Sequence, residues 1–435
     1  FNPGSSDTLS RTLSTPTNNK KFTFSFWFKK CENGREQHFV NGGAASSQFY
    51  INSSDQLYFY DQTAGGTYKT TQVFRDVSAW MHIVVAEDTT QGTASSRIRI
   101  YVNGSEITDF AIETDPTQNN GSAYNTAATH TIGTYAVSPS GYYYSGYLAE
   151  FVFVDGQQLA PTDFGEFDSD SPTIWKPKDV SGLTFGNNGF HLDFEDSSAL
   201  GNDVSGNNND FSVTNLAATD QSTDTCTNNF ATINSLNTHT SINLSEGNLK
   251  ATGASSSSWV AGAGTIGITK GFPCYWEAKA TTSTRLYFGL SRLEEADPVT
   301  STPSAFEGTS VTDYMWRATT ANTIFYRGSN LGATISAVST GDIMACSVDS
   351  SGIVKFYNNG SVIYTFSQAL IDGFFYFPIF ALNNYSSTET IEANFGNPAF
   401  SISSGNTDAN GYGNFEHAPP ANHYALNTKN LSEFG

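Results

Sequence analysis

Residues Ile98–Ile107 (IRIYVNGSEI) recur in similar form at Val354–Ile363 (VKFYNNGSVI). Each stretch alternates apolar and polar residues, reaches Asn-Gly, and continues with Ser-x-Ile. Asn and Gly tolerate the positive φ angles of a type I′ turn, so Asn-Gly between two alternating runs predicts a β-hairpin. Asn103 and Asn359 would then hold equivalent positions in two hairpins. The repeat therefore predicts two related β-sandwiches and indicates a binding or structural module rather than a conventional enzyme.

The composition favours an all-β protein with very little helix. The 435 residues suffice for two or three domains, each with its own hydrophobic core. Phe (33) and Tyr (21) are frequent, whereas charged residues make up 14% of the chain against about 25% in an average protein. Asn, Ser, Thr and Gly must therefore cover much of the surface, and these residues suit turns and strands better than helices.

The charge balance argues against nucleic acid as a partner. The formal net charge is −20, and such a field repels the phosphates of DNA and RNA. The sequence also has no secretory apolar region and no apolar run long enough to cross a bilayer. We therefore expect neither nucleic-acid binding nor membrane insertion.

Alternating apolar runs divide the chain into four parts. The clearest run, Phe22–Phe28 (FTFSFWF), places four phenylalanines on one face of a strand. Similar short runs, separated by Gly, Asn, Ser and Asp, continue to about residue 178 and resume at about residue 243. We expect a sandwich at 1–178, a linker and loop-rich transition at 179–242, a second sandwich at 243–400 and an extended C-terminal arm at 401–435.

Several of these runs resemble a known superfold. The segments at Phe22–Phe28, Trp80–Val85, Tyr101–Gly104 and Gly146–Glu150 are similar to those of the laminin-G-like, concanavalin-type jelly roll. The second half resembles a SPRY-type sandwich of the same superfold, at Tyr275–Lys279, Phe288–Leu290, Gly341–Ile343, Val354–Gly360 and Asn394–Phe400. The resemblance implies an all-β fold of two concanavalin A-like β-sandwich (jelly roll) domains in tandem.

Three longer phrases resemble the appendage proteins of tailed, particularly marine, bacteriophages. They are Gly165–Lys178 (GEFDSDSPTIWKPK), Gly201–Gln221 (GNDVSGNNNDFSVTNLAATDQ) and Gly411–Gly435 (GYGNFEHAPPANHYALNTKNLSEFG). The resemblance implies a structural protein at the virion surface, in a fibre, appendage or decoration. Its partners would be other virion proteins, copies of itself and glycans of the host surface. A secreted or cell-surface carbohydrate-binding protein unrelated to a virion is the alternative, and a glycan hydrolase is a third class.

Catalytic motifs are missing from the sequence. A laminarinase-type glycosidase on this superfold would need Glu-x-Asp-x-x-Glu on one strand, so that two carboxylates face the cleft. Glu113–Gln118 ends in an amide and contains Pro, and Glu166–Ser171 has no third carboxylate in register. Neither an HExxH pair nor a GxSxG elbow occurs. We therefore expect no enzymatic activity and no required cofactor.

The stretch from residue 193 to residue 210 carries the candidate metal ligands Asp193, Asp196, Asp203 and Asp210. Carboxylate oxygens on a Gly- and Asn-rich backbone suit Ca²⁺, so calcium is a hypothesis for this loop. A solvated, turn-rich loop would have the same composition, and the spacing is not that of an EF-hand.

Two groups of aromatic residues are candidate sugar-binding platforms. The first comprises Tyr142, Tyr143, Tyr144 and Tyr147; the second comprises Tyr314, Trp316 and Tyr326. Aromatic faces stack on the C–H surfaces of sugars, and neighbouring Asn and Asp can bind the hydroxyl groups. The same residues also fill hydrophobic cores and subunit interfaces, which is the alternative for both groups.

Overall fold

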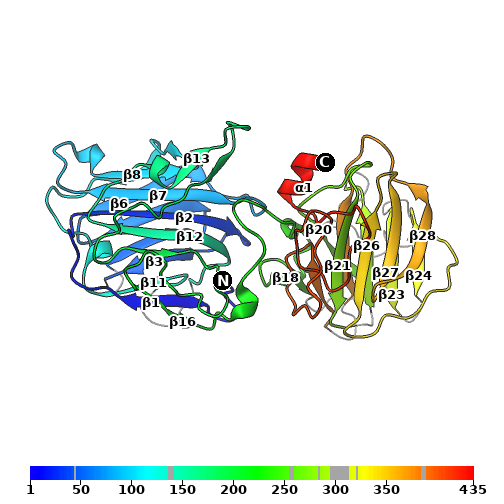
Figure 1. Cartoon of the computed structure of the whole chain (residues 1–435). Helices are drawn as coiled ribbons and strands as arrows, with labels where there is room; N and C mark the ends of the chain where they lie inside the picture. The colour runs from blue at the N-terminus through cyan, green and yellow to red at the C-terminus, as the bar shows by residue number, and fades with distance from the viewer. Residues whose placement is uncertain are drawn as a thin grey trace. The chain divides into compact units, whose positions relative to one another are not determined.

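The computed structural model describes residues 1–43, 46–135, 142–253, 259–282, 285–293, 313–319, 322–383 and 388–435. The chain forms two compact units, Phe1–Gln221 and Ser222–Gly435 (Figure 1). Each unit consists mainly of two antiparallel sheets. Within the described ranges, α1 (Thr428–Phe434) is the one α-helix, and no helix is long and apolar enough to cross a membrane. The predicted all-β fold with tandem sandwiches is confirmed.

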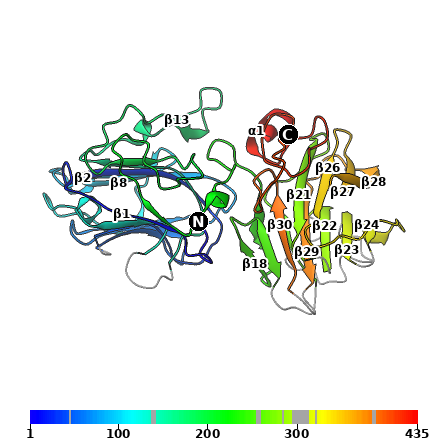
Figure 2. The same cartoon turned by 60° about the horizontal axis from the view of Figure 1, so that its bottom comes forward.

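Two sheets, which we call A1 and B1, form the layers of the first unit (Figure 2). In spatial order, A1 contains β10 (Phe110–Thr114), β6 (Gly66–Val73), β5 (Gln56–Asp61), β4 (Ser47–Ile51), β3 (Gln37–Gly42), β11 (Thr129–Ile132), β1 (Thr8–Thr12) and β16 (Ser212–Thr214). B1 contains β15 (Phe190–Leu192), β12 (Gly146–Asp155), β2 (Lys21–Lys30), β7 (Met81–Asp88), β8 (Ile98–Val102) and β9 (Ser105–Glu106).

The core of the first unit lies between A1 and B1 and is rich in phenylalanine. The four phenylalanines of β2 join one buried cluster, as their alternation predicts. The rings of Phe26 and Phe151 are stacked 4.7 Å apart, and Phe26 also lies 5.0 Å from Phe39 of the facing sheet. Close ring packing of this kind adds to the stability gained by removing apolar surface from water.

The second unit also has two layers, sheets A2 and B2. A2 contains β17 (Ile233–Thr238), β20 (Trp259–Gly264), β29 (Phe377–Asn383), β22 (Arg285–Ser291), β23 (Tyr314–Thr319), β24 (Thr323–Tyr326) and β25 (Ser329–Asn330). B2 contains β18 (Ile242–Ser245), β19 (Lys250–Gly253), β30 (Thr390–Asn394), β21 (Cys274–Ala280), β26 (Ile343–Val348), β27 (Ile353–Asn358) and β28 (Ser361–Ala369). Its core includes Trp276, Phe288 and Phe356.

The two sandwiches share one strand order. Strands β1 to β9 take the same places in A1 and B1 as β20 to β28 take in A2 and B2. The strands β11 and β12 likewise correspond to β29 and β30. The internal duplication that the repeated decapeptide predicts therefore extends to nearly every central strand.

Asn103 and Asn359 occupy the same turn of the two sandwiches. Asn103 has φ 47° and joins β8 to β9, and Asn359 has φ 46° and joins β27 to β28. Asn103 Oδ1 accepts from the backbone N–H of His82 at 2.8 Å, and Asn359 Oδ1 accepts from that of Ile343 at 2.9 Å. The predicted hairpins are confirmed, and they lie in separate units.

The edge strands of the two units lie on opposite sides of the central strands in the sequence. In the first unit, β15 and β16 follow the central strands in sequence and pair with β12 and β1. In the second unit, β17 and β19 precede the central strands and pair with β20 and β30. Residues 179–221 therefore belong to the first unit and residues 222–242 to the second, because their backbone groups complete the sheets where we expected a linker.

The outer faces of B1 and B2 are covered by other parts of the same unit. Val84 and Val152 of B1 pack against Phe164 and Val180, which flank the hairpin of β13 (Gly165–Phe167) and β14 (Trp175–Pro177). Tyr275 of B2 packs against Phe415 of the C-terminal arm. The arm thus packs on its own sandwich, and it ends in α1 (Figure 1).

Candidate functional site

A row of stacked aromatic rings crosses the outer face of sheet A1. His38, Tyr50 and Tyr58 are cross-strand neighbours on β3, β4 and β5. The rings of His38 and Tyr50 are 4.5 Å apart with an interplanar angle of 10°, and those of Tyr50 and Tyr58 are 4.9 Å apart at 22°. We call these three residues the aromatic ladder. They point outward because Phe49 and Phe59, their neighbours in sequence, point into the core.

Tyr135 and Tyr142 close the His38 end of the aromatic ladder. Their ring centroids lie 5.1 Å and 5.6 Å from that of His38, and the two tyrosine rings meet edge to face at 6.0 Å. Tyr142 is 42% exposed, whereas His38 is completely buried. The backbone N–H of His38 also donates to the carbonyl of Tyr142 at 3.1 Å. An exposed tyrosine is thus fixed over a buried imidazole.

The aromatic ladder offers ring edges and hydroxyl groups more than open ring faces. In a face-to-face stack the inner faces cover one another, so Tyr50 has no free face between His38 and Tyr58. Burial, and then Glu36, raises the pKa of Tyr50, which keeps its hydroxyl protonated and able to donate. Lys69 lies opposite Tyr58 on the next strand. This face therefore carries phenol hydroxyl groups that can donate and accept hydrogen bonds.

A polar groove of about 600 Å³ lies elsewhere on the first unit, beside the β8–β9 hairpin. It is lined by Thr71, Gln72, Val102, Asn103, Ser105, Glu106, Ile107, Thr108 and Asp109. Several of these groups already have partners: Thr71 donates to Asp109, Glu106 pairs with Arg99, and Asn103 accepts from the backbone. The groove is open, but few of its polar groups are free to hold a ligand firmly.

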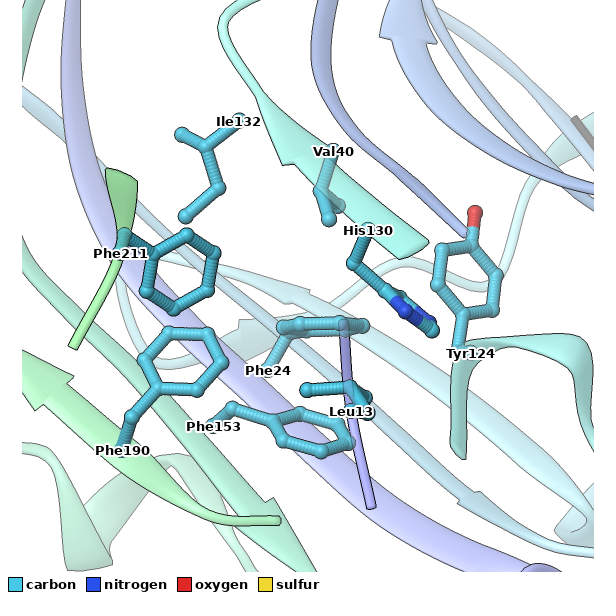
Figure 3. A pocket seen from close by; sticks show the side chains of 9 residues that line it. All are labelled: Leu13, Phe24, Val40, Tyr124, His130, Ile132, Phe153, Phe190 and Phe211. Carbon is cyan, nitrogen blue, oxygen red and sulfur yellow. The ribbon is translucent and has the colours of Figure 1, made fainter. Parts of the chain in front are cut away.

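One void in the interior of the first unit is too small to be a ligand pocket. This void, of about 10 Å³, lies among phenylalanine rings and the imidazole of His130 (Figure 3). A single water needs about 10–15 Å³, so nothing larger fits. Burial lowers the pKa of His130, and its Nδ1 bonds the carbonyl of Ala128 at 2.9 Å. His130 is therefore a neutral core residue.

Three of the predicted sugar-binding residues are core residues, so their prediction as platforms was wrong. Tyr144, Tyr314 and Trp316 are 0%, 1% and 0% exposed. The hydroxyl of Tyr144 donates to the carbonyl of Lys29 at 3.0 Å, inside the first unit. Tyr314 and Trp316 belong to the inward-facing set of β23, where every second residue faces the second core. A sugar cannot reach any of the three rings.

Tyr143, Tyr147 and Tyr326 are half-buried. Lys29 Nζ lies 5.5 Å from the ring centroid of Tyr147, and Tyr326 packs against Tyr314 at 5.2 Å. The Tyr143 carbonyl accepts from Arg35 at 3.1 Å. Of the seven predicted residues, Tyr142 packs at the end of the aromatic ladder. The Ser-Pro-Ser-Gly loop before Tyr142 lies outside the described residues.

The four candidate calcium ligands do not converge. Asp203 is buried and accepts hydrogen bonds from the backbone N–H groups of His191, Ser205 and Asn209. Asp210 accepts from the backbone of Asp203, whereas the other two bind residues of their own turns, Asp193 with Glu195 and Asp196 with Ser198. In the part of the chain that the structure describes, no group of three or more His, Cys, Asp or Glu could hold a metal. These carboxylates shape the loop.

The carboxylate strings considered for catalysis are also paired. The Tyr68 hydroxyl donates to Asp115 at 2.6 Å, and Lys176 Nζ lies 3.0 Å from Asp168 and 3.7 Å from Glu166. Both strings thus have partners within the first unit.

Comparison with protein families identifies the fold of the first sandwich. Residues 3–160 match the family model described as the concanavalin A-like lectin/glucanases superfamily, laminin G type. The first sandwich is concanavalin A-like. This matched range contains β1 to β12, and therefore most strands of A1 and B1 and the whole aromatic ladder. Comparison with curated proteins found no match.

Similar solved structures include the SPRY domain of human HERC1, with 18% identity, 37% of this chain and 96% of that chain covered, and TM-score 0.31. A SAP-like pentraxin from Limulus polyphemus has 16% identity, coverage of 35% and 71%, and TM-score 0.27. A protein from Bacteroides ovatus, provisionally described as carbohydrate-binding, has 14% identity, coverage of 48% and 56%, and TM-score 0.31. These are similarities of fold alone.

Proposed function

We propose that the chain is a non-enzymatic structural protein of a tailed-phage virion, exposed in a fibre, appendage or decoration, and that its first sandwich adheres to glycans of the host surface. The observation that carries the adhesion proposal is the aromatic ladder with Tyr142 at its end, on a sandwich that matches a lectin/glucanase model. Tyr142 is the exposed ring of this cluster, and Tyr50 and Tyr58 are partly exposed beside it.

The chemistry of the aromatic ladder fits a sugar. The exposed ring of Tyr142 can pack on an apolar C–H face, and the hydroxyls of Tyr50 and Tyr58 can exchange hydrogen bonds with sugar hydroxyls. Lys69 can donate to ring or glycosidic oxygens. Such a site is shallow, so each copy would bind weakly. Repetition on a particle would compensate, because avidity can exceed single-site affinity by about 10²–10⁴.

The virion proposal is supported by the three phrases that resemble phage appendage proteins. Two of them cover the outer faces of B1 and B2: Gly165–Lys178 contains the β13–β14 hairpin, and Gly411–Gly435 is the end of the C-terminal arm. The third, Gly201–Gln221, contains the Asp203 turn and β16. All three phrases therefore form parts of the two sandwich units.

Binding to arrayed bacterial polysaccharides and oligosaccharides tests the adhesion proposal. We expect Tyr58→Ala and Tyr142→Ala to weaken binding at least ten-fold, about 1.4 kcal/mol, without unfolding the protein. Phe375→Ala is the matched control, because Phe375 is 57% exposed in the second unit and far from the ladder in sequence. Absence of binding to every glycan, or an equal loss in the control, would contradict the proposal.

Mass spectrometry of purified particles tests the virion proposal, with many copies per particle as the expected result. A secreted carbohydrate-binding protein would instead sediment as a free monomer and be absent from particles. Analysis of the arrayed glycans for released products tests the absence of catalysis; hydrolysis abolished by changing one acidic residue would contradict it.

A further inference from the structure

Gln37 of β3 is a completely buried side chain whose amide is hydrogen-bonded at both ends. Its Oε1 accepts from the backbone N–H of Ser145 at 3.0 Å, and its Nε2 donates to the backbone carbonyl of Glu32 at 2.9 Å. The first partner can only donate and the second can only accept, so the orientation of the amide is fixed. Gln37 therefore links the loop before β3 to the segment before β12.

The segment before β12 carries Tyr142, the exposed ring of the proposed site. Arg35 supports the same segment, because its Nη2 donates to the carbonyl of Tyr143 at 3.1 Å. The Nε of Arg35 lies 3.0 Å from a carboxylate oxygen of Glu32. The loop that Gln37 binds through the Glu32 carbonyl thus also holds the residue that follows Tyr142.

The side chain of Gln37 does not reach the outer face of sheet A1. Residues directly opposite each other on paired strands point to the same face of a sheet. Gln37 lies opposite Ile51, which belongs to the core, whereas His38 lies opposite Tyr50 of the aromatic ladder. Gln37 therefore cannot touch a glycan on the outer face, and any effect on affinity must pass through the residues that it holds.

We propose that Gln37, assisted by Arg35, is a positioning residue of the glycan site: it fixes residues 142–145 and thereby keeps the Tyr142 ring in place against His38. This inference rests on the proposed function. A ring that is already fixed loses less conformational freedom when a ligand binds, so pre-organisation increases affinity without any contact to the ligand.

A double-mutant cycle tests this coupling. Gln37→Met keeps a side chain of similar length but has no amide, and we expect it to raise the dissociation constant for the best-binding oligosaccharide of the array about two- to ten-fold, the range for one side chain that loses its pre-organisation. In the Tyr142→Ala background the same change should leave the dissociation constant unchanged, because no ring remains to be positioned. In the Tyr58→Ala background it should keep its full effect.

Gln158→Met is the matched control for a general loss of stability. Gln158 Nε2 donates to the backbone carbonyls of Ser96 at 3.0 Å and Ala86 at 3.3 Å, so this variant also loses bonds to the backbone of the first unit. It should lower the Tm and leave the dissociation constant unchanged.

Arg35→Gln is the second variant and carries the cycle if Gln37→Met does not fold. The side chain of Arg35 is 27% exposed, so its replacement leaves no buried void. It should weaken glycan binding in the wild-type background and have no effect in the Tyr142→Ala background. A loss that persists without the Tyr142 ring would show direct contact with the glycan and contradict positioning.

Proton NMR of the free protein gives a readout that needs no glycan. We expect nuclear Overhauser contacts between the rings of Tyr142 and His38 in the wild type, in accord with their separation of 5.6 Å. Gln37→Met should lose these contacts and keep those between Tyr50 and Tyr58, whose rings are stacked at 4.9 Å.

The inference is overturned if Gln37→Met binds the oligosaccharide like the wild type, if it weakens binding equally in the Tyr142→Ala background, or if it keeps the Tyr142–His38 ring contacts. Glycan binding through Tyr58 would still stand in each of these cases. Loss of the adhesion proposal would instead appear as Tyr58→Ala and Tyr142→Ala both binding like the wild type, and it would overturn the positioning role as well.

Discussion

The indole Nε1 of Trp175 donates a hydrogen bond to Nδ1 of His82 at 2.9 Å. An indole N–H can only donate, so Nδ1 must be the acceptor and the His82 proton must be on Nε2. From there it donates to Ser25 Oγ at 2.8 Å. Trp175 also packs against the turn after β8, where a Cβ on Gly104 would lie 2.7 Å from the indole. A neutral histidine thus anchors the β13–β14 hairpin on sheet B1.

This bond predicts that the first unit loses stability in acid. Burial lowers the pKa of His82 from 6.5 to about 3. Between these values the unfolded chain binds a proton that the folded chain does not, so the free energy of unfolding falls as the pH falls, by at most about 1.4 kcal/mol per pH unit. His82→Gln can still accept from Trp175 and should show a smaller slope in urea denaturation from pH 7 to pH 4. His239→Gln, in the second unit, should leave the slope of the first unit unchanged.

Glu87 predicts that the first unit loses stability as the pH rises. It is fully buried, and burial together with the nearby Asp61 raises its pKa well above 4.5. Above pH 4.5 the unfolded chain loses a proton that the folded chain keeps, so stability declines as the pH rises toward the folded pKa. Glu87→Gln should stabilise the first unit by at least about 1 kcal/mol at pH 7 and by almost nothing at pH 4. An equal gain at both pH values would refute this, and Glu113→Gln serves as the exposed control.

The two equivalent turns predict that the same substitution lowers the folding stability of each unit by a similar amount. Asn103→Ala removes the acceptor for the His82 N–H and puts alanine at positive φ, which together should cost about 1–3 kcal/mol in the first unit. Asn359→Ala should cost a similar amount in the second unit. Hydrogen exchange of peptides from each unit assigns the loss. Asn103→Gly, which tolerates the positive φ, should lose less than Asn103→Ala.

Glu277 predicts how the C-terminal arm is held. Its buried carboxylate accepts from the Tyr275 hydroxyl at 3.0 Å, from Asn394 at 3.1 Å, and from the backbone N–H groups of Glu416 and His417 at 2.9 and 2.8 Å. Glu277→Gln has one oxygen for four donors and should cost about 2–4 kcal/mol. Limited proteolysis should then cut residues 401–435 faster. Glu433→Gln, at an exposed position of α1, keeps an oxygen that can accept from Asn410 and should be cut at the wild-type rate.

Local sequence was sufficient to predict the hairpins and the first core. Asn-Gly specifies its turn because both residues tolerate positive φ, and the alternation of Phe22–Phe28 specifies which face of the strand is buried. Each of these signals acts within a single turn or strand, so it can be recognised from local sequence. The topological equivalence of the two sandwiches followed from two such hairpins.

The aromatic ladder could be predicted only in part. The pattern around Tyr50 and Tyr58 shows that both rings point away from the core, since Phe49 and Phe59 take the inward phase. That His38 and Tyr50 face each other depends on the β3–β4 register, which shifts between His38 and Val40. Conversely, Tyr314 and Trp316 were predicted to bind sugars because they are aromatic, although their alternation along β23 turns both side chains into the core.

Short edge strands and loop carboxylates carried the weakest signals. β15 and β16 each span three residues, too few for a period to be seen, so residues 179–221 resembled a linker. Asp203 was indistinguishable from a calcium ligand because composition does not show whether a carboxylate is already bound by its own loop.

The opposite placement of the edge strands has a consequence for synthesis of the chain on the ribosome. The first sandwich can form most of its two layers early, but β16 is not complete until residue 214 has been translated. The backbone groups of β1 at that edge of sheet A1 therefore stay unpaired during elongation. The second sandwich has the reverse order. Its flanking strands β17 to β19 emerge before any central strand, and β18 can pair with β19, and β17 with β20, soon after they emerge. These two pairs join the rest of their sheets only when β29 and β30 arrive about 140 residues later, so both sheets close at nearly the same moment.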